Sequence, residues 1–150
     1  METDGLGQLY RQLVERARDA IVVADRDGII RLWNAGAEEI FGYRADEAVG
    51  QTLDLIIPEH LRARHWEGYR RAVAAGATRY GRDLLKVPAV RRDGARLSLE
   101  FTVVLLREDG GQVAGVGAII RDVTARWHED RQLRRRLAEL EAEVRRASGA

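Results

Sequence analysis

The sequence predicts an α+β domain in which short helices cover one face of a five-stranded antiparallel sheet, with an amphipathic helix at each end. Three observations lead to this class. Apolar runs of strand length are joined by Asp-Gly turns at three places. Short helical pieces broken by Gly and Pro lie between the second and third runs, and both ends of the chain repeat leucine at helical spacing. A chain of 150 residues has room for one such domain.

The first segment, residues 1–18, is expected to form an amphipathic helix that ends near Asp19. Leu6, Leu9 and Leu13 recur at helical spacing among charged residues. The helix therefore has one apolar face, and we expect that face to take part in a homodimer.

Two apolar runs, residues 20–25 and 29–34, are separated by Arg26, Asp27 and Gly28. Asp and Gly supply the positive backbone angle that a tight turn requires, so this pair is predicted to be a β-hairpin. Asn34 follows the second run and is a suitable N-cap for the helix after it.

Short helices are predicted within residues 35–43, 44–50 and 53–59, because each piece is too short to be stable alone and is punctuated by Gly or Pro. Gly42 and Gly50 are expected to end two of them in the left-handed conformation. A longer helix is predicted from residue 59 to about residue 75, between Pro58 and Gly76.

Three further strands are predicted at residues 83–90, 96–106 and 112–124, joined by two Asp-Gly turns. In the middle strand apolar and polar residues alternate, which indicates that one face is buried. The face expected to be buried carries Leu97, Leu99, Phe101 and Val103. Asp122 and Thr124, at the end of the last strand, are expected to cap the helix that leaves the sheet.

The last segment, residues 125–150, is predicted to be a coiled-coil-like helix. Its apolar residues follow alternating steps of four and three: Leu133, Leu137, Leu140 and Val144. A seam this short is typical of the start of a longer coiled coil or of a flank packed on a partner. We expect it to join the N-terminal helix in forming a homodimer.

The order of these elements, together with several short motifs, resembles the PAS sensory-domain family from about Leu9 to Thr124. The matching segments are residues 19–25, 27–30, 33–38, 40–43, 47–50, 57–58, 92–94 and 121–124. The resemblance implies a PAS domain at residues 19–124 that acts as a sensory module and passes its state to the helix at 125–150. It also implies that Asp122, Val123 and Thr124 relay the signal, although a plain helix cap is equally compatible with these residues.

The resemblance leaves the cofactor undetermined, because PAS domains bind haem, flavin, small acids or nothing. The chain has no Cys, which excludes a cysteinyl flavin adduct, Cys-ligated zinc and iron–sulfur clusters. Non-covalent flavin or a small organic acid would be held by aromatic or arginine side chains. Such aromatic residues more often fill a core or a dimer surface, and such arginines are more often solvated.

Haem b is one cofactor that the resemblance allows, since haem-PAS oxygen sensors carry their ligand histidine in a stretch similar to residues 58–65. His65 would then be the axial ligand of the iron. The other residues assigned to the pocket are Trp66, Tyr69, Tyr80, Arg82 and Leu85. Leu85 falls where those sensors place a distal arginine, and an apolar wall there would suit carbon monoxide or nitric oxide better than oxygen. The alternative is a structural histidine, either bonded to the backbone or packed beside Trp66.

The sequence carries no P-loop, Ser/His/Asp order or metal motif, so we predict that the domain is not an enzyme. The net charge of +1 argues against nucleic acid and anionic membranes as partners. The arginine runs at 134–136 and 145–146 share their helix with glutamates, as on a solvated ion-paired face. We expect a cytoplasmic protein whose downstream partner is a kinase, a cyclase or a regulator.

Overall fold

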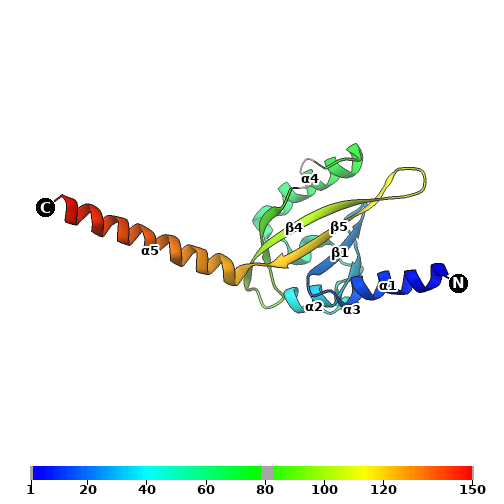
Figure 1. The fold of residues 1–150 in the computed structure, drawn as a ribbon. Helices are drawn as coiled ribbons and strands as arrows, with labels where there is room; N and C mark the ends of the chain where they lie inside the picture. The colour runs from blue at the N-terminus through cyan, green and yellow to red at the C-terminus, as the bar shows by residue number, and fades with distance from the viewer. Residues whose placement is uncertain (1, 79–82, 150) are drawn as a thin grey trace.

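The structure is a computed structural model that describes residues 2–78 and 83–149, so Tyr80 and Arg82 lie outside the described residues. Its centre is a five-stranded antiparallel sheet with the strand order β2-β1-β5-β4-β3 (Figure 1). The strands are β1 (Ala20–Asp25), β2 (Ile30–Trp33), β3 (Leu85–Val90), β4 (Arg96–Arg107) and β5 (Val113–Asp122). The predicted five-stranded sheet is therefore confirmed.

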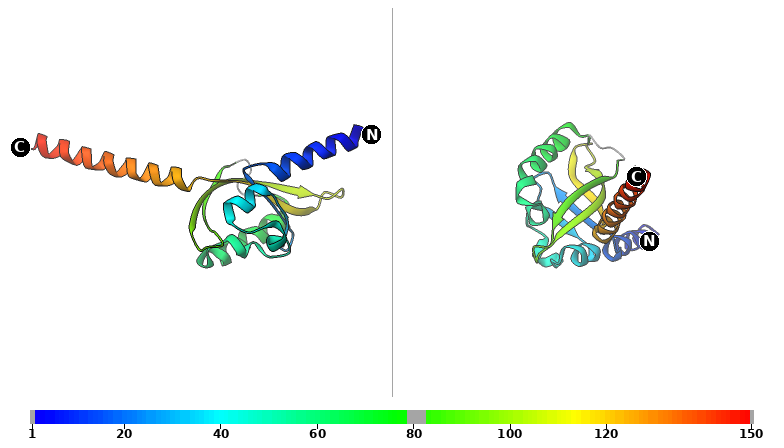
Figure 2. Two further views of the ribbon diagram at one scale, coloured as in Figure 1. Left: turned by 90° about the horizontal axis from the view of Figure 1, so that it is seen from below. Right: turned by 90° about the vertical axis from the view of Figure 1, so that its left-hand side faces the viewer.

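The helices fall into two groups (Figure 2). One group covers a single face of the sheet: α2 (Ala35–Phe41), α3 (Ala45–Ala48), α4 (Arg62–Ala75) and the 3-10 turns η1 (Leu53–Ile56) and η2 (Glu59–Leu61). The other group projects away from the domain at its two ends: α1 (Glu2–Arg16) and α5 (Thr124–Ser148). This arrangement leaves much of the opposite face of the sheet uncovered by helices.

The predicted boundaries differ from the structure by a few residues. The helix predicted to begin at Glu59 begins at Arg62, because the preceding residues wind into a tighter turn closed by the Leu61 N–H donating to the Pro58 carbonyl at 2.9 Å. The strand predicted from Asp83 begins at Leu85, where pairing with Phe101 of β4 starts.

The core lies between the sheet and the helices that cover it. The alternation predicted for β4 is present, since Leu97 and Leu99 are buried and Phe101 packs against the core. Val103, which was also predicted to be buried, is only half-buried. The fully buried large side chains are Phe41 and Ile30.

Asn34 is a buried polar residue that joins three elements. Its Oδ1 accepts from the Ala37 N–H at 2.9 Å, as predicted for the cap of α2, and from the Ile21 N–H of β1 at 2.8 Å. Its Nδ2 donates to the carbonyls of Val14 at 2.8 Å and Asp19 at 3.0 Å. The end of α1 is thereby fixed to the sheet and to α2.

Candidate functional site

The structure brings together three of the residues assigned to the pocket, all from α4. The ring centroids of His65 and Trp66 are 4.7 Å apart, those of His65 and Tyr69 are 5.8 Å apart, and those of Trp66 and Tyr69 are 5.3 Å apart. The three rings form a cluster on one turn of the helix. Leu85 lies on β3 opposite Phe101.

The side chains of α4 also anchor the helix to the neighbouring elements. The Trp66 Nε1–H donates to Asp54 Oδ1 of η1 at 2.7 Å, and the Tyr69 hydroxyl donates to the Asp25 carbonyl of β1 at 2.5 Å. Arg62 donates to the carbonyls of Asp54 at 3.2 Å and Ile57 at 3.1 Å. We call Arg62, Trp66 and Tyr69, together with these hydrogen-bond partners, the α4 latch.

The β1–β2 turn is shaped to receive Trp66. Gly28 has a φ of +80°, and a Cβ atom added there would lie 2.1 Å from Cζ3 of Trp66. The sequence predicts the glycine as a turn residue, whereas its contact with α4 joins segments distant in the chain. Gly28 therefore serves both the turn and the packing of the latch.

Burial shifts the pKa of two residues in the cluster. Burial, assisted by Asp25 and Asp27, raises the pKa of Tyr69, so its hydroxyl remains a donor. Burial lowers the pKa of His65, against the opposing charge of Asp54. The His65 ring is therefore neutral near pH 7, and its Nδ1 is buried without a hydrogen-bond partner among the described residues.

A neutral imidazole is the form that binds a metal ion, so His65 fits the donor chemistry of a haem ligand. His60, by contrast, is exposed. Within residues 2–78 and 83–149, no three His, Asp or Glu side chains gather so that they could hold a metal ion, at His65 or at any other place.

The predicted relay residues lie where α5 meets β4. The Val123 N–H donates to the Ser98 carbonyl at 2.9 Å, and the Ser98 N–H donates to Thr124 Oγ1 at 2.9 Å. Asp122 Oδ1 accepts from the Thr124 N–H at 2.9 Å. The predicted caps differ from this: Asp122 accepts from the first helical N–H, but the N-cap position is Val123, which makes no side-chain cap bond. The Thr124 side chain binds Ser98 of β4 and Asp122 instead of capping the helix.

The residues assigned to a dimer interface are all exposed. On α1, Leu13 is 70% exposed, and on α5, Leu133 is 68% exposed. The others are Leu6, Leu9, Leu137, Leu140 and Val144. Each helix therefore carries an uncovered apolar stripe on a segment that projects from the domain (Figure 2).

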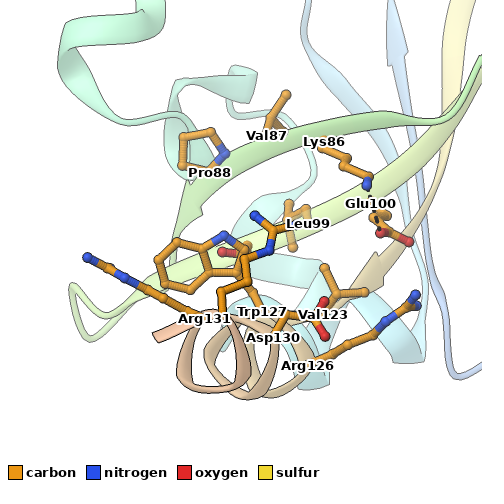
Figure 3. A pocket seen from close by; sticks show the side chains of 12 residues that line it. Lys86, Val87, Pro88, Leu99, Glu100, Val123, Arg126, Trp127, Asp130 and Arg131 are labelled. Carbon is orange, nitrogen blue, oxygen red and sulfur yellow. Dashed lines mark ion pairs between the residues drawn. The ribbon is translucent and has the colours of Figure 1, made fainter. Parts of the chain in front are cut away.

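A groove of about 650 Å³ lies between the first turns of α5 and the edge of the sheet formed by β3 and β4 (Figure 3). We call it the junction groove. Its lining includes Lys86, Glu100, Arg126, Trp127, Asp130 and Arg131. Because these residues come from three separate segments, residue spacing along the chain does not predict the groove. The only local signal is the spacing of Trp127 and Arg131, one helical turn apart.

None of the helices in the described part of the chain is long and apolar enough to cross a membrane.

A family model described as the PAS fold matches residues 14–128. An uncharacterized protein of Azorhizobium caulinodans is 35% identical over 126 residues, which are 83% of this chain and 17% of that protein. Sensor protein FixL of Bradyrhizobium diazoefficiens is 32% identical over 137 residues, 89% of this chain and 25% of that protein. Oxygen sensor protein DosP of Escherichia coli is 24% identical over 128 residues, 85% of this chain and 16% of that protein. The chain spans a quarter or less of the length of these relatives.

Solved structures of the same fold include the PAS domain of a Colwellia psychrerythraea protein, with a TM-score of 0.70 and 25% identity. That match covers 80% of this chain and 98% of the other. An RNA-binding light-oxygen-voltage receptor has a TM-score of 0.69 and 26% identity, covering 91% of this chain and 38% of the other.

Proposed function

Because the chain belongs to the PAS fold family, we propose that it is a non-catalytic sensory module that passes the state of its ligand site, or of a bound partner, to α5. The observation that carries the proposal is the attachment of α5 to β4 through Ser98. The Ser98 carbonyl accepts from the Val123 N–H, and the Ser98 N–H donates to the hydroxyl of Thr124, the first residue of α5. A shift of β4 within the sheet would move these two bonds together. The direction in which α5 leaves the domain would then change with the sheet.

The proposed output is a parallel homodimer. The α5 seam alternates steps of four and three residues, and its leucines are exposed. With Leu137 and Leu140 at the apolar seam positions, Arg136 of one parallel helix would face Glu141 of its partner, which is an attractive pair. The exposed leucines of α1 would extend the same interface.

Sedimentation equilibrium of the full chain tests the dimer. We expect a dimer that Leu137→Glu converts to a monomer, because the substitution places a charge in the seam. Arg146→Gln, on the same helix but outside the seam, should leave the dimer intact. A strict monomer at high protein concentration would exclude the dimer.

The proposed downstream partner is a kinase, a cyclase or a regulator. The names of the relatives support this class, since two of them are sensor proteins and the chain spans only a part of each. A further relative, the methanogenesis regulatory histidine kinase FilI of Methanothrix harundinacea, is 30% identical over 115 residues.

A haem-based gas sensor is the second candidate, favoured by the neutral and half-buried His65 with its unpartnered Nδ1. His65 would hold the iron, with Trp66 and Tyr69 beside it, and bound haem would supply an iron that takes up a diatomic gas. The latch would keep His65 in place, since Trp66 and Tyr69 fix its helix to η1 and β1.

Haem reconstitution followed by an absorption spectrum tests this second candidate. We expect a Soret band that shifts or disappears in His65→Ala and is unchanged in His60→Ala, a matched exposed histidine. The absence of a Soret band, or a band that His65→Ala leaves unaltered, would exclude haem ligation by His65.

A further inference from the structure

We propose that the junction groove is a second ligand site, which binds a small anion carrying a flat aromatic ring, such as a nucleotide. The groove lies outside the cluster of rings on α4, between α5 and the edge of the sheet (Figure 3). Its volume of about 650 Å³ is in the range of small-molecule sites, roughly 300–1,000 Å³.

Positive charge dominates the groove. Four cationic side chains line it, Lys86, Arg126, Arg131 and Arg134, against the two carboxylates Glu100 and Asp130. Glu100 already has a partner, since Lys86 Nζ lies 4.0 Å from its Oε1. The arginines therefore leave a net positive lining that suits phosphate or carboxylate, which the guanidinium group binds through paired N–H donors.

Trp127 supplies an aromatic surface in the same groove. Its side chain is 45% exposed and lies on the side of α5 that faces β3 and β4 (Figure 3). The guanidinium carbon of Arg131 lies 5.2 Å from the Trp127 ring centroid, which stabilises the ring in place. A half-exposed tryptophan beside several arginines is suited to stacking on the planar ring of an anionic ligand.

The groove also contacts the connection between the sheet and α5. Ser98 and Val123 line the groove, and the Val123 N–H donates to the Ser98 carbonyl, which joins β4 to the segment that leads into α5. A ligand in the groove would touch both the sheet and α5. The site therefore lies where a bound molecule would hold the exit helix at one angle to the sheet.

Calorimetric titration of the full chain tests the site with three probes: adenosine diphosphate, adenosine and pyrophosphate. We expect adenosine diphosphate to bind at one site at least tenfold more tightly than either of the other two, because only it offers both a ring and an anion. Trp127→Leu should weaken adenosine diphosphate about tenfold and leave pyrophosphate unchanged. Arg126→Gln should weaken adenosine diphosphate and pyrophosphate alike, about fivefold.

Arg146→Gln, an arginine on the same helix outside the groove, should bind adenosine diphosphate as the unaltered chain does. Circular dichroism melts check that each variant is folded, which we expect because the altered side chains are exposed on α5. The proposal is overturned if adenosine diphosphate shows no saturable binding at millimolar concentration. It is also overturned if pyrophosphate binds equally well, or if Trp127→Leu and Arg126→Gln both bind normally.

Discussion

His65 carries a ring nitrogen that is buried without a partner in the described part of the chain, and this makes protonation of the ring costly. The sequence is compatible with two interpretations of His65, a haem ligand and a structural histidine packed beside Trp66. The structure has the contact with Trp66, and this contact is compatible with both interpretations. The structure adds the burial of one ring nitrogen of His65, which residue spacing on a helix does not specify.

The lowered pKa of His65 predicts a stability that depends on pH. The folded pKa lies below the ordinary value of 6.5, so the unfolded chain binds more protons as the pH falls through that value. The contribution is complete above about pH 6.5 and is lost as the pH falls towards the folded pKa. Thermal melts between pH 8 and pH 5 should therefore show a steeper loss for the unaltered chain than for His65→Gln. His60→Gln is the control and should keep the steep profile; equal slopes in all three proteins would contradict the prediction.

Asn34 is the second residue on which the fold depends individually, because its side-chain amide bonds to α1, β1 and α2 together. Asn34→Ala should lower the free energy of unfolding by about 2–4 kcal/mol, since it removes a helix cap and leaves buried groups unpaired. Urea denaturation measures this loss. Thr52→Ala, which removes the exposed cap of η1, should cost less than about 1 kcal/mol. A similar loss of unfolding free energy in the two variants would argue against a structural role for the buried Asn34 side chain beyond that of an exposed cap.

At the scale of elements, the local features were predictable and the contacts between distant elements were not. The β1–β2 turn, the cap of α2 and the Gly42 end of that helix follow from residues next to each other in the chain. The α4 latch and the junction groove join separate segments, so periodicity and turn signals do not specify them. Helix α4 begins at Arg62 because the residues before it, Glu59–Leu61, form a 3-10 turn. Pro58 marks the start of a helical segment but does not indicate which kind of turn follows it.

The packing of α4 on the β1–β2 turn predicts an unequal response at two glycines. Gly28 and Gly94 both have positive φ, but only at Gly28 would a Cβ meet a neighbour, Trp66. Gly94→Ala should cost about 1 kcal/mol from backbone strain, and Gly28→Ala should cost more because of the added clash. In a Trp66→Ala background the excess at Gly28 should vanish. Urea denaturation of the double-mutant cycle measures it, and an excess that persists would contradict the contact.

In the sheet as a whole, hairpin turns identify three of the four strand pairings, β1–β2, β3–β4 and β4–β5, because consecutive strands joined by short turns pair with each other. The remaining pairing, of β1 with β5, joins the two groups of strands into one sheet. It links residues about a hundred positions apart and has no local signal. The resemblance to a known family, carried by motifs such as residues 121–124, implies the fold in which this pairing occurs. The helices at both ends were predicted from leucine spacing, which is independent of the sheet.

Two α5 helices paired along their leucine seam are the central feature of the proposed sensory dimer. The chain has no Cys, so Arg145→Cys provides a unique spin-label site near the end of α5, outside the seam. In a parallel dimer the helix axes lie about 10 Å apart, which brings the two labels within range of pulsed dipolar spectroscopy. We predict one narrow distance distribution in the full chain, abolished by Leu137→Glu. Labels without dipolar coupling, or a distance unaffected by Leu137→Glu, would contradict the account.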